Sequence, residues 1–469
     1  MSGYKAPGKS DQPKNRREFL KRSSLLTGLG LGAGLSMVSM EGASANLPGY
    51  KSLVIIHLNG GNDANDLILP LDAGFNDYER SRPSIALRRD AITPLSSRYL
   101  DRTLGVNRAL DPIMPLFHRG NMAFLVNAGA LVKPTTAADV LNRRAVLPPF
   151  LYSHPEQTQY VQGWMGDVDP SGWAGRAIEA MDPEGGFRSP LVAVNSSNNT
   201  VVRGQRSRVV NMNTWSSEWM GPANLSDNTS RWTQMLDMLS RQQSNSAVES
   251  EYARTFRGVY LDNEELARAD RSTREPAGNF DNNEIARRLR KLAKIMPYYK
   301  TAGASRQVYF IEWGSFDTHT NQRYTNVTAG NADQDTQLRQ LANALAAFDT
   351  SLAQVGLSNE VVVFVTSEFS RTLDPAAGNG SDHAWGSHWM VMGADVMGAR
   401  MYGQKFPMLV LGGEDDAHDG RRGYFVPQLS SDQVAADLLL WLGLPAGKLT
   451  SIMPNLQNFA QQSVGFMRI

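Results

Sequence analysis

The sequence predicts an α/β fold in which helices cover both faces of a central sheet. Seven short apolar runs have the length of strands, and most are nearly continuously hydrophobic, as expected for strands buried on both faces. Helical patterns lie between these runs, and strands that alternate with helices are typical of this fold class. Polar residues follow several of the predicted strands, at the sheet edge where α/β proteins bind ligands.

The predicted strands are residues 52–58, 122–127, 191–195, 307–313, 360–366, 388–392 and 408–411. The predicted helices are residues 173–181, 229–242, 283–296, 335–354 and 431–442. Residues 200–300 differ from the rest, because they are polar and helical in pattern without a convincing strand. We interpret this range as a helical insertion or cap on the sheet and not as an independent domain.

The composition bounds the class of protein. The chain has 469 residues, of which 41% are hydrophobic and 20% charged, enough for a large core in one big domain or two smaller ones. The net charge is +1, so no overall charge draws the chain to nucleic acid or to anionic lipid. The absence of cysteine excludes disulfides, thiolate metal sites and a cysteine nucleophile.

The N-terminus has the order of an export signal. Arg16 and Arg17 lie in a basic region, a glycine-rich apolar run covers residues 25–38, and Ala43-Ser44-Ala45 is a small-residue cleavage pattern. The paired arginines indicate the twin-arginine export machinery. The apolar run is too short to span a membrane comfortably. We therefore expect residues 1–45 to be removed and a periplasmic or secreted mature chain, without a membrane anchor, to begin near Asn46; an amphipathic N-terminal arm is the alternative.

The first polar cluster is HLNGGNDAND, in which two glycines and then Asp63 follow a predicted strand. The glycines allow a sharp turn, and an acid in such a turn can bind a cation. A turn with an Asx cap explains the same residues without function.

The second cluster, YSHPEQ, reads as a helix start with Ser153 or His154 at the cap. Capping is the simpler explanation. The functional alternative is a hydroxyl nucleophile at a helix N-terminus, where the helix dipole favours a bound anion.

The third and fourth clusters combine acids with histidines. Asp317 and His319 stand two apart beyond a strand, where they can share one ion or form a metal-free pair. Glu368 follows the strand 360–366, and Arg371 is placed to contact a phosphate or sulfate or to pair with Glu368. Three further candidates lie downstream, namely Asp382, His383 and His388.

Together these clusters supply six possible metal ligands, Asp63, Asp317, His319, Asp382, His383 and His388. Carboxylates and imidazoles without sulfur suit zinc, manganese, calcium or magnesium, and the number of histidines favours a transition metal. One or two divalent ions there would stabilise an in-line displacement at phosphorus or sulfur. Ser153 bound to an ion would be activated as the attacking group.

Six motifs occur in an order that resembles a known family: LNGGNDANDLILP, SHPEQTQYVQGW, GWAGRAIEAM, SFDTHTNQ, SEFSRT and SDHAWGSH. They are similar to the domain of unknown function 1501 family, a bacterial family exported by the twin-arginine route. That family is placed in the alkaline phosphatase and sulfatase superfamily. The resemblance covers residues 51–454.

The resemblance implies a three-layer α/β/α alkaline-phosphatase-like sandwich, with a mostly parallel sheet, a bimetal centre at one sheet edge and a single domain over residues 46–469. It implies one metal site from Asp63, Ser153, Asp382 and His383, and a second from Asp317, His319 and His388. The nucleophile stands closer to the first strand in such enzymes than Ser153 does, so Thr135 and Thr136 are alternatives.

We therefore expect a metal-dependent hydrolase of anionic phosphate or sulfate esters, including those of polysaccharides. Ser153 would attack, Arg371 or His154 would hold the anionic group, and Glu368 would orient a ligand or water. The rival hypothesis is a non-catalytic periplasmic or surface protein that binds a polysaccharide or an exported partner protein. Four tryptophans would suit sugar stacking or an ordinary core: Trp164, Trp173, Trp385 and Trp389. No G-x-S-x-G elbow of a metal-free serine hydrolase is present.

Overall fold

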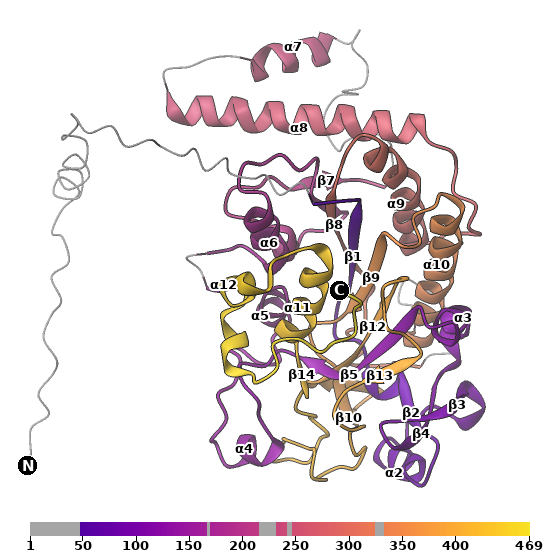
Figure 1. Ribbon diagram of the computed structural model, residues 1–469. Coiled ribbons are helices and arrows are strands. Elements are labelled where there is room, and N and C mark those ends of the chain that lie inside the picture. Colours follow the sequence, from indigo (N-terminus) through magenta and orange to yellow (C-terminus); the bar gives the residue numbers. More distant parts are fainter. Residues whose placement is uncertain (1–46, 167–168, 215–230, 242–245, 324–332) are drawn as a thin grey trace, which may run out of the picture. The chain divides into compact units, whose positions relative to one another are not determined.

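The computed structural model describes residues 47–469 apart from 167–168, 215–230, 242–245 and 324–332 (Figure 1). The predicted export signal, residues 1–45, lies outside the described residues. Within the described part of the chain, no helix is long and apolar enough to cross a membrane.

The central sheet has nine strands, in the order β13–β5–β12–β9–β1–β8–β6–β7, with β14 paired to β5. All neighbouring strands are parallel except for β12, which is antiparallel to both β5 and β9. The strands are β1 (Lys51–Leu58), β5 (Met122–Gly129), β6 (Leu191–Val194), β7 (Val210–Met212), β8 (Arg306–Trp313), β9 (Val361–Thr366), β12 (Ser387–Met392), β13 (Arg400–Tyr402) and β14 (Leu429–Ser430). Six of the seven predicted strands are confirmed.

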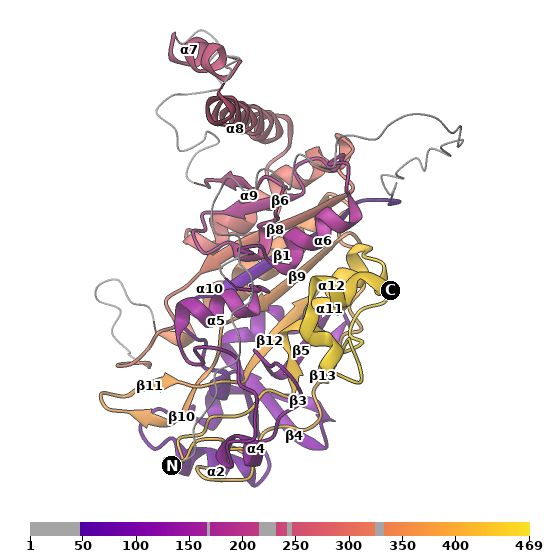
Figure 2. The same cartoon turned by 90° about the vertical axis from the view of Figure 1, so that its left-hand side faces the viewer.

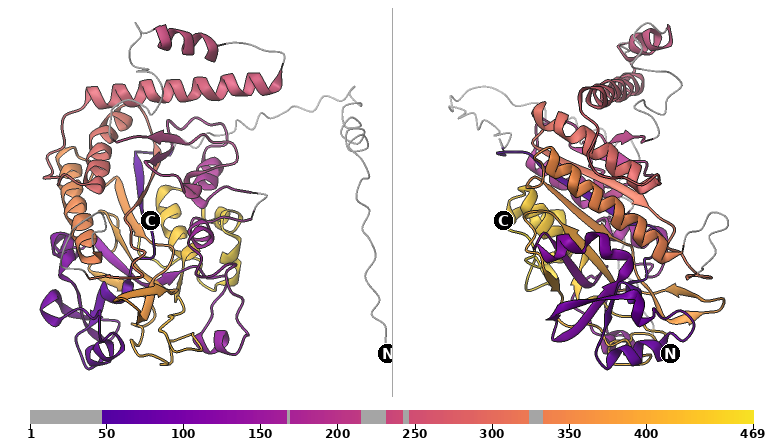
Figure 3. Two further views of the ribbon diagram at one scale, coloured as in Figure 1. Left: turned by 180° about the vertical axis from the view of Figure 1, so that it is seen from behind. Right: turned by 90° about the vertical axis from the view of Figure 1, so that its right-hand side faces the viewer.

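Helices cover both faces of this sheet, as Figures 2 and 3 show from two sides. On β1, Val54 and Ile56 belong to one buried cluster with α9 (Glu284–Thr301), α10 (Gln334–Gln354) and α3 (Met114–His118). Leu53 and Ile55 belong to the other cluster, with α6 (Trp173–Met181), α11 (Ser431–Leu442) and α12 (Leu449–Ile452). Successive residues of a strand point to opposite faces, so the run Leu53–Ile56 is apolar because both faces of β1 are buried. The expected mostly parallel sheet between two helical layers is confirmed.

Smaller elements flank the main sheet. A second sheet has the order β2–β4–β3, and a two-stranded sheet joins β10 and β11. These strands are β2 (Ile68–Pro70), β3 (Ile92–Tyr99), β4 (Arg102–Asn107), β10 (Arg371–Ala376) and β11 (Gly380–His383). The remaining α-helices are α2 (Gly74–Ser81), α4 (Ala137–Leu141), α5 (His154–Val161), α7 (Arg231–Ser240) and α8 (Ala247–Ser272), and the short 3-10 helices are Ala64–Asp66, Arg89–Ala91, Arg108–Ile113, Thr200–Val202, Ala446–Lys448 and Pro454–Asn458.

The structure differs from the sequence prediction at two places. Residues 408–411 are not a strand. Pro407, directly before them, has no N–H to donate to a sheet ladder, and Met408 is exposed. The range 200–300 contains β7, which extends the main sheet, and α9 packs against that sheet.

The carboxyl ends of β1, β8 and β9 meet at one edge of the sheet, because these strands are parallel neighbours. The turn after β1 passes very close to the segment after β8. A Cβ atom on Gly60 would lie 2.4 Å from the backbone nitrogen of Asp317, and Gly60 has φ 105°, so only glycine fits there. This close approach brings the polar segments that follow the three strands together.

Candidate metal centre

Three histidines and one aspartate converge at this edge. His154 is the first residue of α5, Asp317 and His319 follow β8, and His383 ends β11. The Nε2 atom of His383 lies 3.0 Å from Nε2 of His154 and 3.0 Å from Nε2 of His319. The Oδ1 atom of Asp317 lies 3.0 to 3.4 Å from each of the three Nε2 atoms. Ligand atoms around a tetrahedral zinc ion lie about 3.3 Å apart, so these five separations are of the size found in a metal site.

The hydrogen bonds of two histidines fix which ring nitrogen carries the proton. His383 Nδ1 lies 2.8 Å from the carbonyl oxygen of Tyr152, which can only accept. His154 Nδ1 lies 2.7 Å from Oε1 of Glu368. Each Nδ1 therefore donates, and each neutral ring turns the bare lone pair of its Nε2 toward the other ring and toward Asp317. Because such lone pairs repel at 3.0 Å, the arrangement attracts positive charge, either a proton on His154 or a metal cation.

Glu368 is the buried anchor of this arrangement. Its Oε2 lies 3.2 Å from Nε2 of His57 on β1, and its Oε1 also accepts from the backbone N–H of Gly60 at 2.9 Å. Burial raises the pKa of Glu368, but the hydrogen bonds from His154 and His57 outweigh burial and hold it well below its usual value. Burial likewise lowers the pKa of His154, but Glu368 raises it by more. Glu368 thus makes the His154 ring a stronger electron donor, as carboxylates behind metal-binding histidines do.

Asp382 lies at the outer side of the cluster. Its Oδ1 is 3.7 Å from Nδ1 of His319, and its Oδ2 accepts from Nη1 of Arg422 at 3.0 Å. Among the described residues, two sets could hold an ion, one with His154 and Asp317 and one with His319 and Asp382, and His383 belongs to both. Since Nδ1 of His383 donates to the Tyr152 carbonyl oxygen, Nε2 is the ring nitrogen of His383 that remains to bind a metal. Its single lone pair can bind one ion. The cluster therefore suits a single ion better than two.

Arg371 is a structural residue and not an anion-binding one. Its side chain is fully buried, and its guanidinium donates to the carbonyl oxygens of Gly60, Gly61, Phe316 and Ser381 and to Asp317. No free edge remains to contact a phosphate or sulfate, so that expectation is wrong. Burial raises the pKa of Asp317, but the Arg371 guanidinium lowers it by more and keeps Asp317 ionised.

Asp63 is not part of the cluster, which corrects the prediction that it binds metal. It is fully buried, its Oδ2 accepts from Arg82 and from Gln322 at 2.5 Å each, and its Oδ1 accepts from the backbone of Asn65 at 3.0 Å. Arg82 also bonds Asp66 at 2.7 Å. Asp63 therefore has a cation already, and it is the guanidinium of Arg82.

His388 also lies outside the cluster. It is on β12, where its Nδ1 accepts from the backbone N–H of Asn127 at 3.0 Å and its ring packs 5.6 Å from that of Phe406. Burial lowers the pKa of His388 to about 4, so the ring stays neutral. Of the six predicted ligands, four lie in the cluster, namely Asp317, His319, Asp382 and His383. His154, which was not among the six, is a fifth possible ligand.

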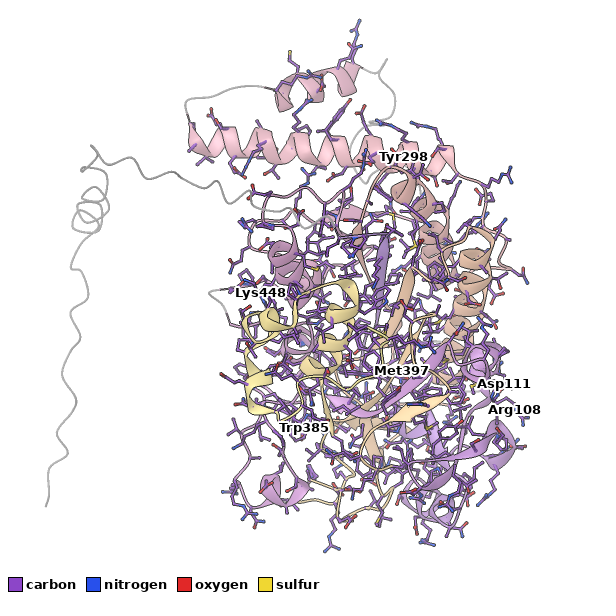
Figure 4. All side chains as sticks on the ribbon, viewed as in Figure 1. Arg108, Asp111, Tyr298, Trp385, Met397 and Lys448 are labelled. Atoms are coloured by element: carbon purple, nitrogen blue, oxygen red, sulfur yellow. The ribbon has the colours of Figure 1, made fainter. Side chains whose placement is uncertain are left out.

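The candidate hydroxyl nucleophiles are engaged elsewhere. Ser153 stands directly before α5, but its Oγ pairs with Glu156. Thr136 caps α4 through Asp139, and Thr135 donates to the carbonyl oxygen of Lys133 at 2.9 Å. Among the tryptophans, Trp173, Trp385 (labelled in Figure 4) and Trp389 are buried in the core, so they offer no surface for sugar stacking.

Sequence reasoning missed three contributors to the site. His57 and Tyr152 both lie in stretches that contain predicted site residues, but neither was predicted to contribute. Tyr152 adopts φ 74°, a conformation rare for residues other than glycine. Arg422 has no motif around it. The side chains of His319, Asp317 and Asp382 are 46%, 43% and 40% exposed, so the cluster is open to solvent on their side.

Three solved structures resemble this one at low sequence identity. The structure is similar to the phosphonate monoester hydrolase SpPMH of Silicibacter pomeroyi, at 11% identity over 85% of this chain and 74% of that one, with a TM-score of 0.32. It is also similar to the C-terminal periplasmic domain of EcEptC from Escherichia coli in complex with zinc (9% identity, 75% and 74% of the chains, TM-score 0.28). A third similarity is to the lipoteichoic acid synthase LtaP of Listeria monocytogenes (8% identity, 68% of this chain, TM-score 0.25), and there this chain spans 56% of the other's length.

These TM-scores are too low to carry an argument about activity. No curated protein matches the sequence. The family comparison is stronger, because one family of proteins of unknown function matches residues 50–408, which include every residue of the cluster. The chain belongs to this family, DUF1501.

Proposed function

We propose that this protein is an exported, metal-dependent hydrolase of phosphate or sulfate esters. One observation supports the proposal above all others. Nε2 of His383 lies 3.0 Å from Nε2 of His154 and from Nε2 of His319, and Oδ1 of Asp317 lies 3.0 to 3.4 Å from all three Nε2 atoms. Imidazole-rich sites of this kind favour zinc or manganese over calcium or magnesium.

The residues that would hold the ion are His154, Asp317, His319 and His383. A divalent ion there would act as a Lewis acid on an ester oxygen and would promote ionisation of water. Glu368 holds the His154 ring in place, the Tyr152 carbonyl holds that of His383, and Arg371 holds Asp317. Three of the four ligands are thus oriented by protein groups before a substrate arrives, while the exposed sides of His319 and Asp382 leave room for one.

Arg422 replaces Arg371 as the residue expected to contact the anionic group. Its side chain is 27% exposed and donates to Asp382 at the open side of the cluster. Its neighbour Arg421 is exposed and provides a matched control.

The test is a panel of aryl phosphates and aryl sulfates, assayed with added zinc, manganese or calcium. Turnover should require metal, and Arg422→Met should raise KM about tenfold, as expected for a lost charge-assisted hydrogen bond. Arg421→Met should leave KM unchanged. The proposal fails if the metal-loaded protein turns over neither class of ester. That outcome would favour a non-catalytic protein that binds a polysaccharide or a partner protein, a reading that the pairing of Ser153 with Glu156 supports.

Export by the twin-arginine route belongs to the same proposal, with residues 1–45 as the signal and residues 46–469 as the mature single domain. The support is the sequence alone, in which Arg16 and Arg17 precede a short apolar run and a small-residue cleavage pattern. Replacing both arginines with lysine should leave the full-length protein in the cytoplasm when cells are fractionated. If the doubly substituted protein still reaches the periplasm, this route is wrong.

A further inference from the structure

A cavity opens at the same edge of the sheet, farther along that edge than the metal centre. It has a volume of about 450 Å³ and lies at the carboxyl ends of β6 and β7. Seven of the nine residues that line it in the described part of the chain have polar side chains, namely Asn195, Ser196, Ser197, Asn211, Asn213, Glu284 and Arg288, and the other two are Ala193 and Met212. Carboxyl ends of parallel strands are where α/β proteins bind ligands.

Glu312, near the end of β8, contacts two residues of the cavity lining, Ser196 and Arg288. The backbone N–H of Glu312 donates to Ser196 Oγ at 2.8 Å, and its Oε1 accepts from Asn198 at 2.7 Å. Its carbonyl oxygen accepts from Arg288. Asp317 follows five residues later. Because β6 neighbours β8 and β8 neighbours β1, the cavity and the metal centre lie about two or three strand spacings apart, roughly 10–15 Å.

The wall of the cavity is fixed by its own hydrogen bonds. Asn195 has φ 48°, and its side-chain oxygen accepts from the backbone N–H of Thr214 at 3.0 Å and from its hydroxyl at 2.8 Å. Ser197 and Asn211 are exposed, and within the described part of the chain their side chains make no hydrogen bond. A rigid wall thus presents a free amide and a free hydroxyl to whatever enters.

The chemistry of the lining selects the class of ligand. Arg288 and Glu284 form an ion pair, so the lining has no net charge for an anion or a cation. Amides and hydroxyls disfavour an apolar ligand, which would leave them unpaired. No aromatic ring lines the described part of the cavity, so a nucleobase has nothing to stack on. A polyhydroxylated ligand satisfies amide, hydroxyl and carboxylate groups together.

We propose that this cavity binds one neutral sugar unit of an oligosaccharide that places a phosphate or sulfate ester, carried two or three units away, at the metal centre. The substrate class is then a phosphorylated or sulfated polysaccharide. The second half of this statement rests on the proposed hydrolase function, whereas the sugar-binding cavity does not.

The experiment is a glycan array that contains neutral, phosphorylated and sulfated oligosaccharides, probed with the metal-loaded mature protein. Asn211→Leu removes a free amide on an exposed strand position, and Ser197→Val removes a free hydroxyl. Asn76→Leu, an exposed change on α2, is the matched control. Binding of the retained glycans, remeasured in solution, should weaken about tenfold in each cavity variant, as the loss of one good hydrogen bond predicts. The control should bind as the unmodified protein does.

A fourth variant, His383→Ala, separates the two proposals. If the cavity binds sugar, neutral glycans should bind to His383→Ala as they do to the unmodified protein, and about tenfold more weakly to Asn211→Leu, whether or not any ester is hydrolysed. The cavity proposal is overturned if the unmodified protein retains no glycan, or if Asn211→Leu and Ser197→Val retain glycans as strongly as the control. Loss of ester hydrolysis alone contradicts only the hydrolase proposal.

Discussion

Replacing His383 with alanine abolishes metal binding in our account, because this side chain supplies the lone pair that both candidate ligand sets share. Its Nε2 is the common neighbour of His154 and His319 at 3.0 Å. Loss of a residue behind a ligand costs about 10–100-fold in metal affinity, so loss of this ligand should cost more. Zinc affinity is measured by equilibrium dialysis against a competing chelator.

The control for this prediction is His118→Ala, an exposed histidine at the end of α3. It removes an imidazole without touching the cluster, so zinc affinity should not change. An unchanged zinc affinity in His383→Ala would show that the convergence of imidazoles is not a metal site. Circular dichroism of both variants checks that each is folded.

Replacing Asp63 with alanine should destabilise the fold by about 3–5 kcal/mol, because it removes one of the two buried carboxylates that pair with Arg82. Asp66 stays bonded to Nη1 of Arg82, but Nη2 of this fully buried guanidinium loses its carboxylate. The shift of the urea midpoint measures the loss. The bound metal per folded chain should stay the same, since Asp63 lies outside the cluster.

Asp77→Ala provides the matched comparison, because Asp77 pairs with Arg80, whose side chain is 73% exposed. An exposed pair contributes about 0–1 kcal/mol, so this change should be nearly silent. If instead Asp63→Ala loses its metal while the urea midpoint barely moves, Asp63 is a ligand after all and our correction is wrong.

The fold was predictable from the sequence where both faces of a strand are buried. β1, β8 and β9 each contain a run of at least four apolar residues, and these runs identified them. β3 was not recognisable, because it contains Pro94 and exposes half of its residues. Single strands that belong to small sheets lack the continuous apolar signal on which the prediction depends.

The site was predictable in its place but not in its membership. Asp317, His319 and His383 were found because polar residues that follow parallel strands meet at one edge. Asp63 satisfies the same rule, yet its partner Arg82 stands nineteen residues away, on no motif. His388 stands at the start of an antiparallel strand, where Asn127 and Phe406 enclose its ring.

His154 shows why roles are harder to predict than positions. A histidine at a helix start resembles an anion-binding group, and only its contact with Glu368, 214 residues away, shows that Nε2 faces the cluster as a lone pair. Proton positions on imidazoles follow from tertiary hydrogen bonds, which no local pattern encodes.

The most direct measurement is anomalous diffraction at the zinc edge from crystals of the zinc-loaded mature protein. Our account predicts one strong peak per chain, within bonding distance of Nε2 of His154, His319 and His383 and of a carboxylate oxygen of Asp317. Zinc bound at Asp63 or His388 instead, or no peak among these imidazoles, would contradict it.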